Sequence, residues 1–534
     1  MEIGRVDAHA SIEAREIETK FTVPPGAAFP DLAGLPGVAS IDDPVELTLE
    51  AVYLDTPDLR LARARTTLRR RTGGTDAGWH LKLPVSSDER TELQLPLGPA
   101  DGEVPPELVT AIRARVREAP LAPVVTLRTH RTVRRLRDAA GRILAEVADD
   151  AVTSSTLGDC EAVVDAWREW EVELVEGDRD LLAAATALLT AAGGDVPPWS
   201  SKLARALGGR LTLAAETADR ASARTGSMAR IGSMGTGSVG TGSVGALLRD
   251  TLRAQRDDLL ARDPRARRDE PDSVHQLRVA TRRLRSTLTT FRPYLARERS
   301  EPVRAELGWL AGLLGAARDA EVARDRFAEL VAQEPVELVL GPVARRLDAD
   351  RGGAYRAAHD VVLVALDTTR YFRLLDTLDA LVIDPPLTGA AAAKAARDLP
   401  PRVRREYGRL ARAMRTALDA APGPHRDELL HEARKSAKRT RYAAEAVTIV
   451  AGRPAARFAR ATESLQTLLG DHHDTVELRT VLRRVGVQAH LDGENAFTYG
   501  RLHALEQARA ERLEARFPAA WDRVSGRRRR RWLR

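Results

Sequence analysis

Charged and apolar residues alternate along short segments of the N-terminal part of this chain, and no other feature constrains its fold more. Residues 16–21 and 169–174 show the pattern most clearly, with acids at alternate positions. Successive side chains of a β-strand point to opposite faces, so each segment predicts a strand with one charged and one apolar face. Acids at matched positions on two distant strands could face each other across an enclosed polar cavity and hold a cation.

The same alternation predicts a series of short strands, which are residues 14–21, 47–54, 66–71, 79–83, 90–95, 125–136, 142–152 and 167–175. Helices are predicted at 107–117 and 181–192. Many short strands are typical of an antiparallel barrel or sandwich. If helices cover the apolar faces, the charged faces line the inside of a barrel, where charges must pair or bind ligands. The alternative is a sandwich whose charged faces meet water.

Composition limits the classes of protein that this chain can belong to. Its 534 residues predict two or three domains. The single cysteine, Cys160, excludes an internal disulfide framework and fits a reducing compartment. The N-terminus lacks the apolar region of a signal peptide, and no apolar run could span a bilayer. We therefore expect a cytoplasmic protein without a membrane partner, and the formal net charge of +7 favours an anionic partner.

A Gly/Ser-rich segment, residues 213–245, divides the chain at the point where strand patterns give way to helical ones. Such a composition predicts a flexible linker. The predicted organisation is a strand-rich domain at 1–212, a helical domain at 246–525 and a basic tail at 526–534. The arginine run 527–531 predicts a disordered segment that binds polyanions without specificity.

An ordered series of motifs gives the strand-rich domain a family resemblance. The series is Glu16-x-Glu18-x-Lys20, Tyr53-x-Asp55, the Arg69-Arg70-Arg71 strand, Lys82, the strand with Arg128, Arg131 and Arg134, Asp149-Asp150, Glu171-x-Glu173 and Ser201-Lys202. Over about residues 10–210 it resembles the CYTH, or triphosphate tunnel metalloenzyme, family. The resemblance implies an eight-stranded antiparallel tunnel that binds a triphosphate and a divalent metal. Activities of that family include hydrolysis of tripolyphosphate, thiamine triphosphate or nucleoside triphosphates, and in some members adenylyl cyclisation.

Residue chemistry suggests how the roles would be divided in such a tunnel. Arginine binds phosphate oxygens in a bidentate manner and lysine supplies a point charge. The candidate phosphate-binding residues are Lys20, Arg69, Arg71, Lys82, Arg131 and Lys202. Mg²⁺ or Mn²⁺ takes oxygen ligands, and the candidate metal ligands are Glu16, Glu18, Glu171 and Glu173. The candidate catalytic residues are Glu16, Glu18, Lys20 and Asp150. Which of Arg128, Arg131 and Arg134 faces the tunnel stays open, because a bulge would change the parity.

The helical domain repeats itself. The pattern H-x-x-R-x-x-x-[RK]-R-x-R begins at His275 and again at His431, and L-G-x-x-[RH]-D ends at Asp319 and again at Asp474. Both pairs have the same separation to within one residue, which indicates an internal duplication. Helical spacing places the basic residues of each copy on one face. These residues are His275, Arg278, Arg282 and Arg285 in the first copy and His431, Arg434, Lys438 and Arg441 in the second.

Few acids offset these faces, so each face repels itself unless an anion binds. Over about residues 240–525 the motifs resemble the CHAD family, the conserved-histidine α-helical domains. That resemblance implies two pseudo-twofold-related four-helix bundles whose basic surfaces bind inorganic polyphosphate. Zinc binding by His472 and His473 is disfavoured, because neighbouring helical residues point about 100° apart. No matching set of cysteines and histidines accompanies them.

The expected fold class is thus α+β and multidomain, with a β tunnel followed by an all-α domain. We expect metal-dependent hydrolysis of inorganic triphosphate, polyphosphate or another triphosphate in the tunnel, and polyphosphate binding by the helices. The alternatives are a non-catalytic polyphosphate-binding protein, or an adenylyl cyclase or nucleoside triphosphatase. Nucleic-acid binding is disfavoured because only 4% of residues are aromatic, which leaves few platforms for base stacking.

Overall fold

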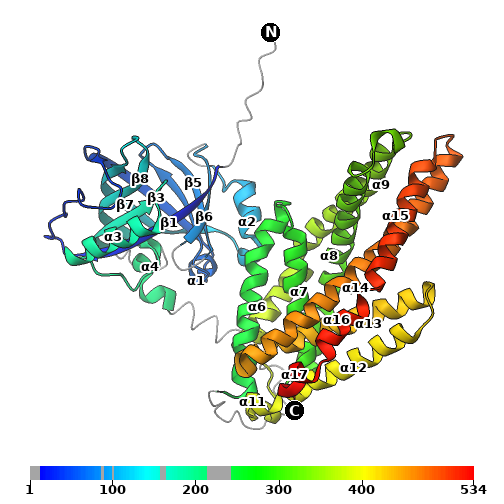
Figure 1. The fold of residues 1–534 in the computed structure, drawn as a ribbon. Coiled ribbons are helices and arrows are strands. Elements are labelled where there is room, and N and C mark those ends of the chain that lie inside the picture. The colour runs from blue at the N-terminus through cyan, green and yellow to red at the C-terminus, as the bar shows by residue number, and fades with distance from the viewer. Residues whose placement is uncertain (1–11, 86–88, 99–101, 157–163, 213–241, 534) are drawn as a thin grey trace. The chain divides into compact units, whose positions relative to one another are not determined.

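The computed structural model describes residues 12–85, 89–98, 102–156, 164–212 and 242–533. It divides into two compact units, Met1–Ala221 and Ser222–Arg534, the first built around strands and the second from helices (Figure 1). Most of the predicted linker, and Cys160, lie outside the described residues. No described helix combines the length and the apolar character needed to cross a membrane.

Antiparallel strands form the first unit. They are β1 (Ile12–Val23), β2 (Ser40–Ile41), β3 (Val45–Asp55), β4 (Thr67–Thr72), β5 (Gly78–Pro84), β6 (Glu89–Pro96), β7 (Ala122–Arg137), β8 (Ile143–Thr156) and β9 (Val164–Leu174). The order β7-β3-β4-β5-β6-β1-β9-β8 closes on itself, because β8 pairs again with β7. The eight-stranded antiparallel barrel is therefore confirmed. The unpredicted β2 adds two residues beside β7 and is too short to show alternation.

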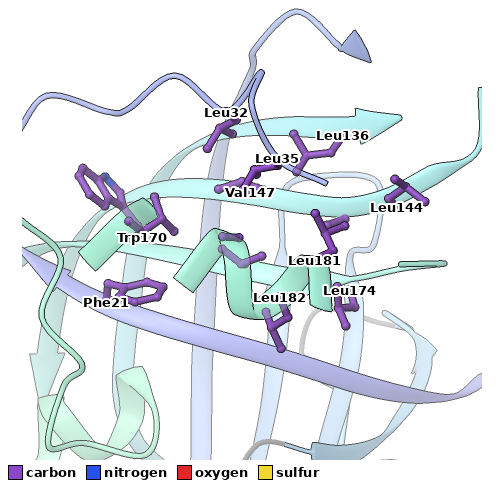
Figure 2. Close-up of a cluster of buried hydrophobic side chains, with 14 of the residues drawn as sticks. Phe21, Leu32, Leu35, Leu136, Leu144, Val147, Trp170, Leu174, Leu181 and Leu182 are labelled. Carbon is purple, nitrogen blue, oxygen red and sulfur yellow. The ribbon is translucent and has the colours of Figure 1, made fainter. Parts of the chain in front are cut away.

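Helices cover the apolar outer face of this barrel. They are α1 (Arg60–Arg63), α2 (Pro106–Val116), α3 (Arg179–Ala191) and α4 (Lys202–Leu207), of which only α2 and α3 were predicted. Figure 2 shows Leu181 and Leu182 of α3 near Leu174 of β9, and Phe21 of β1 belongs to the same buried cluster. A second cluster packs α2 against β5 and β6. Because the apolar side faces the helices, the charged side points into the barrel, and the sandwich alternative is wrong.

Side-chain caps fix the turns that follow the strands. The carboxylate of Asp55 accepts hydrogen bonds from the backbone N–H groups of Leu61 and Ala62, both at 2.9 Å, and so holds α1 at the end of β3. Ser201 is the N-cap of α4, where its Oγ accepts from the backbone N–H of Ala204 at 3.1 Å. This cap places the next residue, Lys202, where its side chain can enter the barrel.

The second unit contains two similar series of helices. The first series is α6 (Val244–Arg267), α7 (Ser273–Thr290), α8 (Arg297–Ala332), α9 (Val343–Leu366) and α10 (Thr369–Ile383). After the short α11 (Ala395–Asp398), the second is α12 (Pro400–Asp419), α13 (Pro424–Ala446), α14 (Thr448–Leu491), α15 (Phe497–Glu514) and α16 (Phe517–Ser525). Ser243 caps α6, so the last residues of the predicted linker already belong to this unit.

The two series are packed against each other. Helices α7 and α13, which carry the duplicated basic motif, are in contact. The long helices α8 and α14 also share a core with α9 and α15, built from residues such as Phe327, Leu347, Leu482 and Leu502 (Figure 1). The helical domain is thus a pair of equivalent bundles that meet through equivalent helices.

The predicted disordered tail is wrong. Residues Arg527–Arg530 form α17, and a 3-10 turn, Arg531–Leu533, follows. Leu533 is only 3% exposed, and the ring of Trp532 lies 5.8 Å from that of Phe458. The two apolar residues that follow the arginine run therefore hold it against the helical domain.

Candidate functional site

A cavity of about 210 Å³ lies inside the barrel. All six predicted phosphate-binding residues line it, namely Lys20, Arg69, Arg71, Lys82, Arg131 and Lys202. The four predicted metal ligands, Glu16, Glu18, Glu171 and Glu173, line it too. Charges of both signs from seven of the eight barrel strands and from α4 are thus brought to one enclosed space.

Carboxylates crowd one part of this cavity. Glu173 lies opposite Glu18 in the register of β1 and β9, and opposite Glu146 in that of β9 and β8. Burial, which Lys82 opposes only in part, and the neighbouring Glu18 raise the pKa of Glu173. Burial and the carboxylate of Glu92 raise the pKa of Glu16 to about 8, although Lys82 opposes them. These acids lack sufficient positive charge of their own.

The same carboxylates fit a divalent cation. Glu16 Oε2 and Glu18 Oε1 are buried, and no donor among the described residues makes a well-directed hydrogen bond to them. Lys82 Nζ lies 2.6 Å from Glu16 and Arg90 Nη1 lies 3.3 Å from Glu18 as ion-pair partners. Glu16, Glu18 and Glu173 together offer three hard oxygen ligands. The raised pKa values of Glu16 and Glu173 favour their protonated forms, and a metal ion can take the place of those protons.

Glu171 has a different environment from the other predicted metal ligands. It accepts hydrogen bonds from Lys20, from Lys202 at 2.7 Å and from Arg131 at 2.6 Å. Despite burial, these cations hold its pKa well below the ordinary value. Glu171 is therefore the centre of an ion-pair network in this state.

A second group of carboxylates lies next to this network. Asp150, Glu169 and Glu171 approach one another closely enough to hold a metal ion. The ammonium group of Lys202 lies 2.9, 2.6 and 2.7 Å from them in turn. Lys202 thus supplies the cation that these three acids require.

Guanidinium groups dominate the opposite part of the cavity. Burial, together with the positive charges of Arg69 and Arg131, lowers the pKa of Arg71 to about 9. Arg71 pairs with Asp76, and Arg69 Nη1 donates to the Tyr53 hydroxyl at 3.3 Å. Burial is the larger cause of this shift, and a nearby anion would relieve both the burial of the charge and the repulsion from Arg69 and Arg131.

Of the three arginines considered on strand β7, only Arg131 faces the cavity. Arg131 faces the cavity, where its Nε and Nη2 donate to the two carboxylate oxygens of Asp150 at 2.8 and 2.6 Å. Arg128 is 64% exposed and pairs with Glu50. Arg134 lies over the ring of Phe29 at 4.4 Å, on the outer face of the barrel.

Asp150 contacts residues of the cavity lining and is not itself among the described residues that line the cavity, so its catalytic role stays a prediction. It is fully buried. Its contacts with Arg131 and Lys202 hold two cavity residues in place. The reason is that Asp150 and Arg131 are direct neighbours in the register of β8 and β7.

Sequence reasoning missed some residues that line the cavity, chiefly Tyr53, Arg90 and Glu92. Arg90 also donates to the backbone carbonyl of Ser200 at 2.5 Å and so ties β6 to the segment before α4. Arg90 and Glu92 share the parity of the predicted charged face of their strand, which is a signal that could have found both. Tyr53 alternates with Ala51 and therefore looks like part of an apolar face.

In the helical domain, the duplicated motifs bring their cations to one place. Burial and the charges of Arg282, Arg434 and Arg278 together lower the pKa of Lys438 to about 6. Burial and the charges of Arg282 and Arg434 also lower the pKa of Arg278. Cations of the first copy thus act directly on those of the second. We call Arg278, Arg282, Arg434 and Lys438 the motif cluster.

Equivalent polar atoms in the two copies lack partners. The Nδ1 atoms of His275 and His431 and the Nε atoms of Arg278 and Arg434 are buried, and no described residue hydrogen-bonds to them. A buried donor without an acceptor is costly, and the same two atoms recur in each copy. Such atoms suit an anionic acceptor that contacts both copies.

The L-G-x-x-[RH]-D motif makes room for these arginines. A Cβ atom added to Gly315 would lie 3.7 Å from the Arg278 guanidinium, and one added to Gly470 would lie 3.1 Å from that of Arg434. The glycines therefore let the guanidinium groups lie close to the backbone of α8 and α14. Asp319, at the end of the first motif, lies 3.6 Å from Arg278.

Two of the predicted arginines lie outside the motif cluster. Arg441 is 9% exposed and pairs with Glu445 at 2.8 Å and Glu463 at 3.0 Å, so its charge is neutralised in this structure and its phosphate-binding role stays a prediction. Arg285 packs against the backbone at Gly308, where an added Cβ atom would lie 3.6 Å from it.

The two neighbouring histidines diverge, as their helical spacing predicted. His473 lies 4.2 Å, ring centre to ring centre, from His431 beside the motif cluster. His472 is buried and its Nε2 lies 3.2 Å from Glu514. The two rings therefore have different neighbours.

A closed antiparallel barrel with opposed acidic and basic regions inside it defines the first unit as a triphosphate-tunnel domain. The comparison with protein families agrees, since residues 14–197 match the CYTH domain and residues 250–483 match the CHAD domain. This chain belongs to the family in which a CYTH domain is followed by a CHAD domain. Its function is thus related to triphosphate or polyphosphate, the CYTH family is metal-dependent, and the acidic cluster in the barrel could bind a metal.

A relative of similar length supports this assignment. The uncharacterized protein MT2285 of Mycobacterium tuberculosis is 39% identical over 531 residues, which cover 96% of this chain and 97% of the relative. Among solved structures, PptA from Streptomyces chartreusis is 26% identical with a TM-score of 0.44, covering 52% of this chain and 99% of its own. The CHAD domain from the plant Ricinus communis is 22% identical with a TM-score of 0.42, covering 52% and 91%.

Proposed function

We propose that the barrel hydrolyses a phosphoanhydride bond of inorganic triphosphate, polyphosphate or a related triphosphate, with Mg²⁺ or Mn²⁺. We further propose that the helical domain binds polyphosphate. The observation that carries the proposal is the separation of charge within one cavity. Acids with raised pKa values lie in one part of it, and an arginine with a lowered pKa lies in another. A metal triphosphate would satisfy both.

The charged residues of the barrel cavity would then have different roles. Glu16, Glu18 and Glu173 would hold the metal, which when bound supplies positive charge next to the phosphates. Arg69 and Arg71 would bind phosphate oxygens and stabilise the charge that builds on them as the bond breaks. The guanidinium group of Arg131 donates two hydrogen bonds to Asp150 and one to Glu171, so its orientation would be fixed before the substrate binds.

The helical domain would supply substrate in this scheme. The motif cluster is self-repelling and has unpartnered buried donors, so an extended phosphate chain is a fitting ligand. Because both domains belong to one chain, polyphosphate held by the helices would reach the barrel at a high effective concentration.

A second candidate function rests on the ion pairs inside the barrel. Lys20, Lys202 and Arg131 are already neutralised by Glu171 and its neighbours, which suits a tunnel that binds phosphate without turnover. Adenylyl cyclisation is less favoured. Apart from Tyr53, the described lining contains no aromatic side chain on which an adenine ring could stack.

Phosphate release tests the proposal. Purified protein is given tripolyphosphate, long-chain polyphosphate, thiamine triphosphate or ATP, with Mg²⁺, with Mn²⁺ or with a chelator. We expect metal-dependent release from at least one of the inorganic substrates. It should be lost in Glu18→Gln and kept in Glu50→Gln, a half-exposed glutamate of β3 that pairs with Arg128. Binding without release from any substrate would favour the non-catalytic alternative, and cyclic AMP formation from ATP would favour the cyclase.

A further inference from the structure

A second basic cavity lies in the helical domain, between α14, α16 and α17. Its volume is about 910 Å³. Five arginines line it, namely Arg457, Arg460, Arg523, Arg528 and Arg529, and the other lining residues are proline, alanine and serine. No acid is among the described residues of this lining. We call these five residues the arginine pocket.

The positions of these arginines follow from the helices that carry them. Arg457 and Arg460 are one turn apart on α14, so they lie on the same face of that helix. Arg528 and Arg529 belong to α17, and Arg523 belongs to α16. The pocket therefore combines residues from the middle of the second repeat with residues from the arginine run near the C-terminus.

The arginine pocket is not neutralised. Among the described residues, no carboxylate forms an ion pair with any of its five arginines, whereas Arg441 on the neighbouring α13 is held by two glutamates. Five like charges around one opening repel one another. Their arrangement is favourable only when an anion contributes the opposite charge.

Apolar contacts hold α17 in place against this repulsion. Leu533 is 3% exposed, Val524 is fully buried, and Trp532 contacts Phe458. Arg530 lies over the ring of Tyr407 at 5.0 Å. The arginines of α17 are thus fixed against α14 by the residues on either side of them, so that the pocket is formed before any ligand binds.

We propose that the arginine pocket is a second binding site for a linear phosphate polymer, separate from the motif cluster. The inference rests on the proposed polyphosphate function of the helical domain and adds a location to it. Guanidinium groups bind phosphate oxygens in a bidentate manner. The described lining has no aromatic side chain, so nucleic-acid bases would find no surface for stacking, and a polymer of phosphates alone fits better.

Helix α14 links the pocket to the motif cluster. Arg460 precedes Gly470, which lies beneath Arg434, by ten residues on this helix, or about 15 Å along its axis. The two sites therefore lie on one helical element, on faces that differ by about 80°. A long polymer bound at both sites would gain avidity that a short phosphate cannot gain.

The test compares paired alanine variants. Arg457→Ala with Arg460→Ala, and Arg528→Ala with Arg529→Ala, remove exposed arginines of the pocket from two different helices. Arg345→Ala with Arg373→Ala removes the same charge from exposed positions on α9 and α10. Arg278→Ala with Arg434→Ala disrupts the motif cluster. Binding of long-chain polyphosphate, tripolyphosphate and single-stranded RNA is measured over a range of salt concentrations, and thermal unfolding verifies that each variant folds.

We expect each pocket pair to weaken long-chain binding roughly tenfold and to lower the salt slope by about two. Tripolyphosphate binding should change little. Losses no larger than in the Arg345/Arg373 control would overturn the inference while leaving the proposed function intact. So would a loss of RNA binding without a loss of polyphosphate binding. If the unmodified protein bound no polyphosphate at all, the proposed function and the inference would both fail.

Discussion

Glu18 and Glu173 lie directly opposite each other across strands β1 and β9, with both side chains inside the barrel. Two buried carboxylates at such a position repel each other unless one is protonated or a cation lies between them. Glu18 has cations of its own, because Lys20 and Lys82 lower its pKa to about 2 although burial opposes them. Glu173 has a raised pKa, so it is the member of the pair that a bound metal ion would stabilise most.

The variant Glu173→Gln should separate metal binding from folding. It removes a buried like charge, so the free energy of unfolding without metal should stay the same or rise by up to about 1 kcal/mol. Stabilisation by Mg²⁺ or Mn²⁺ and phosphate release should both fall, by at least about tenfold. Thermal shift with and without metal measures the first effect. Glu50→Gln is the control, and an unchanged metal response in Glu173→Gln would remove this residue from the metal site.

Glu16 makes the stability of the barrel depend on pH. Its pKa rises from the ordinary 4.5 to about 8 on folding, so between these values the folded state holds a proton that the unfolded chain has released. The free energy of unfolding should therefore fall as pH rises through this window, by up to about 1.4 kcal/mol per pH unit. Glu16→Gln should flatten the dependence in chemical unfolding at a series of pH values. An equally steep dependence in the variant would show that another group is responsible.

A substitution of Arg131 tests whether the planar geometry of its guanidinium group matters as well as its charge. Arg131→Lys keeps the charge and loses the paired hydrogen bonds to the two oxygens of Asp150. We expect KM for the triphosphate to rise about tenfold or more, with a loss of stability of about 1–3 kcal/mol from the partly unpaired Asp150. Arg128→Lys, on the same strand but 64% exposed, is the matched control and should change neither quantity. Equal effects in the two variants would contradict the assignment.

Alternation was enough to predict the barrel strands, because charged and apolar faces differ at every second residue. It could not choose among Arg128, Arg131 and Arg134, since that choice depends on the pairing of Arg131 with Asp150 in the neighbouring strand. It also could not show that Glu171 is surrounded by three cations from three separate segments. Those contacts depend on how the barrel closes.

Helical spacing correctly placed the basic residues of each motif copy on a helix. It could not show that the two copies meet, which needs the contact between α7 and α13. Nor could it show that Arg441 is paired with two acids, because one of them, Glu463, lies on the next helix. In the C-terminal segment, Trp532 and Leu533 follow a run of arginines that is typical of a solvated tail. The packing of these two apolar residues against the helical domain determines the structure of the segment.

Lys438 should make polyphosphate binding depend on pH. Burial and the neighbouring arginines lower its pKa from 10.5 to about 6, so it is mostly neutral at pH 8 in the free protein. A bound polyanion would favour the charged form, so binding above pH 6 takes up a proton and the affinity falls as pH rises. His473, with its pKa lowered to about 4 by burial and neighbouring charges, stays neutral in this range.

Calorimetric titration with polyphosphate between pH 6 and 9 measures this effect. In Lys438→Arg the charge persists, so the affinity should vary less with pH and exceed that of the unmodified protein at pH 8. Lys435→Arg, which replaces a half-exposed lysine paired with Glu432 on the same helix, should leave the dependence unchanged. A dependence that is the same in all three proteins would assign the titration to a different group.

Gly470 should be needed for binding and dispensable for folding. An added Cβ atom would lie 3.1 Å from Nη2 and 3.3 Å from Nε of Arg434, so alanine would push the guanidinium away from its place in the motif cluster. Alanine also favours a helix over glycine by up to about 1 kcal/mol. We therefore expect Gly470→Ala to bind polyphosphate several-fold more weakly while its melting temperature is unchanged or higher. Gly315→Ala is the matched control from the other copy, because its Cβ atom would meet Arg278 at an ordinary 3.7 Å. If the two variants bound equally well, the close approach of Arg434 to α14 would have no part in holding the anion.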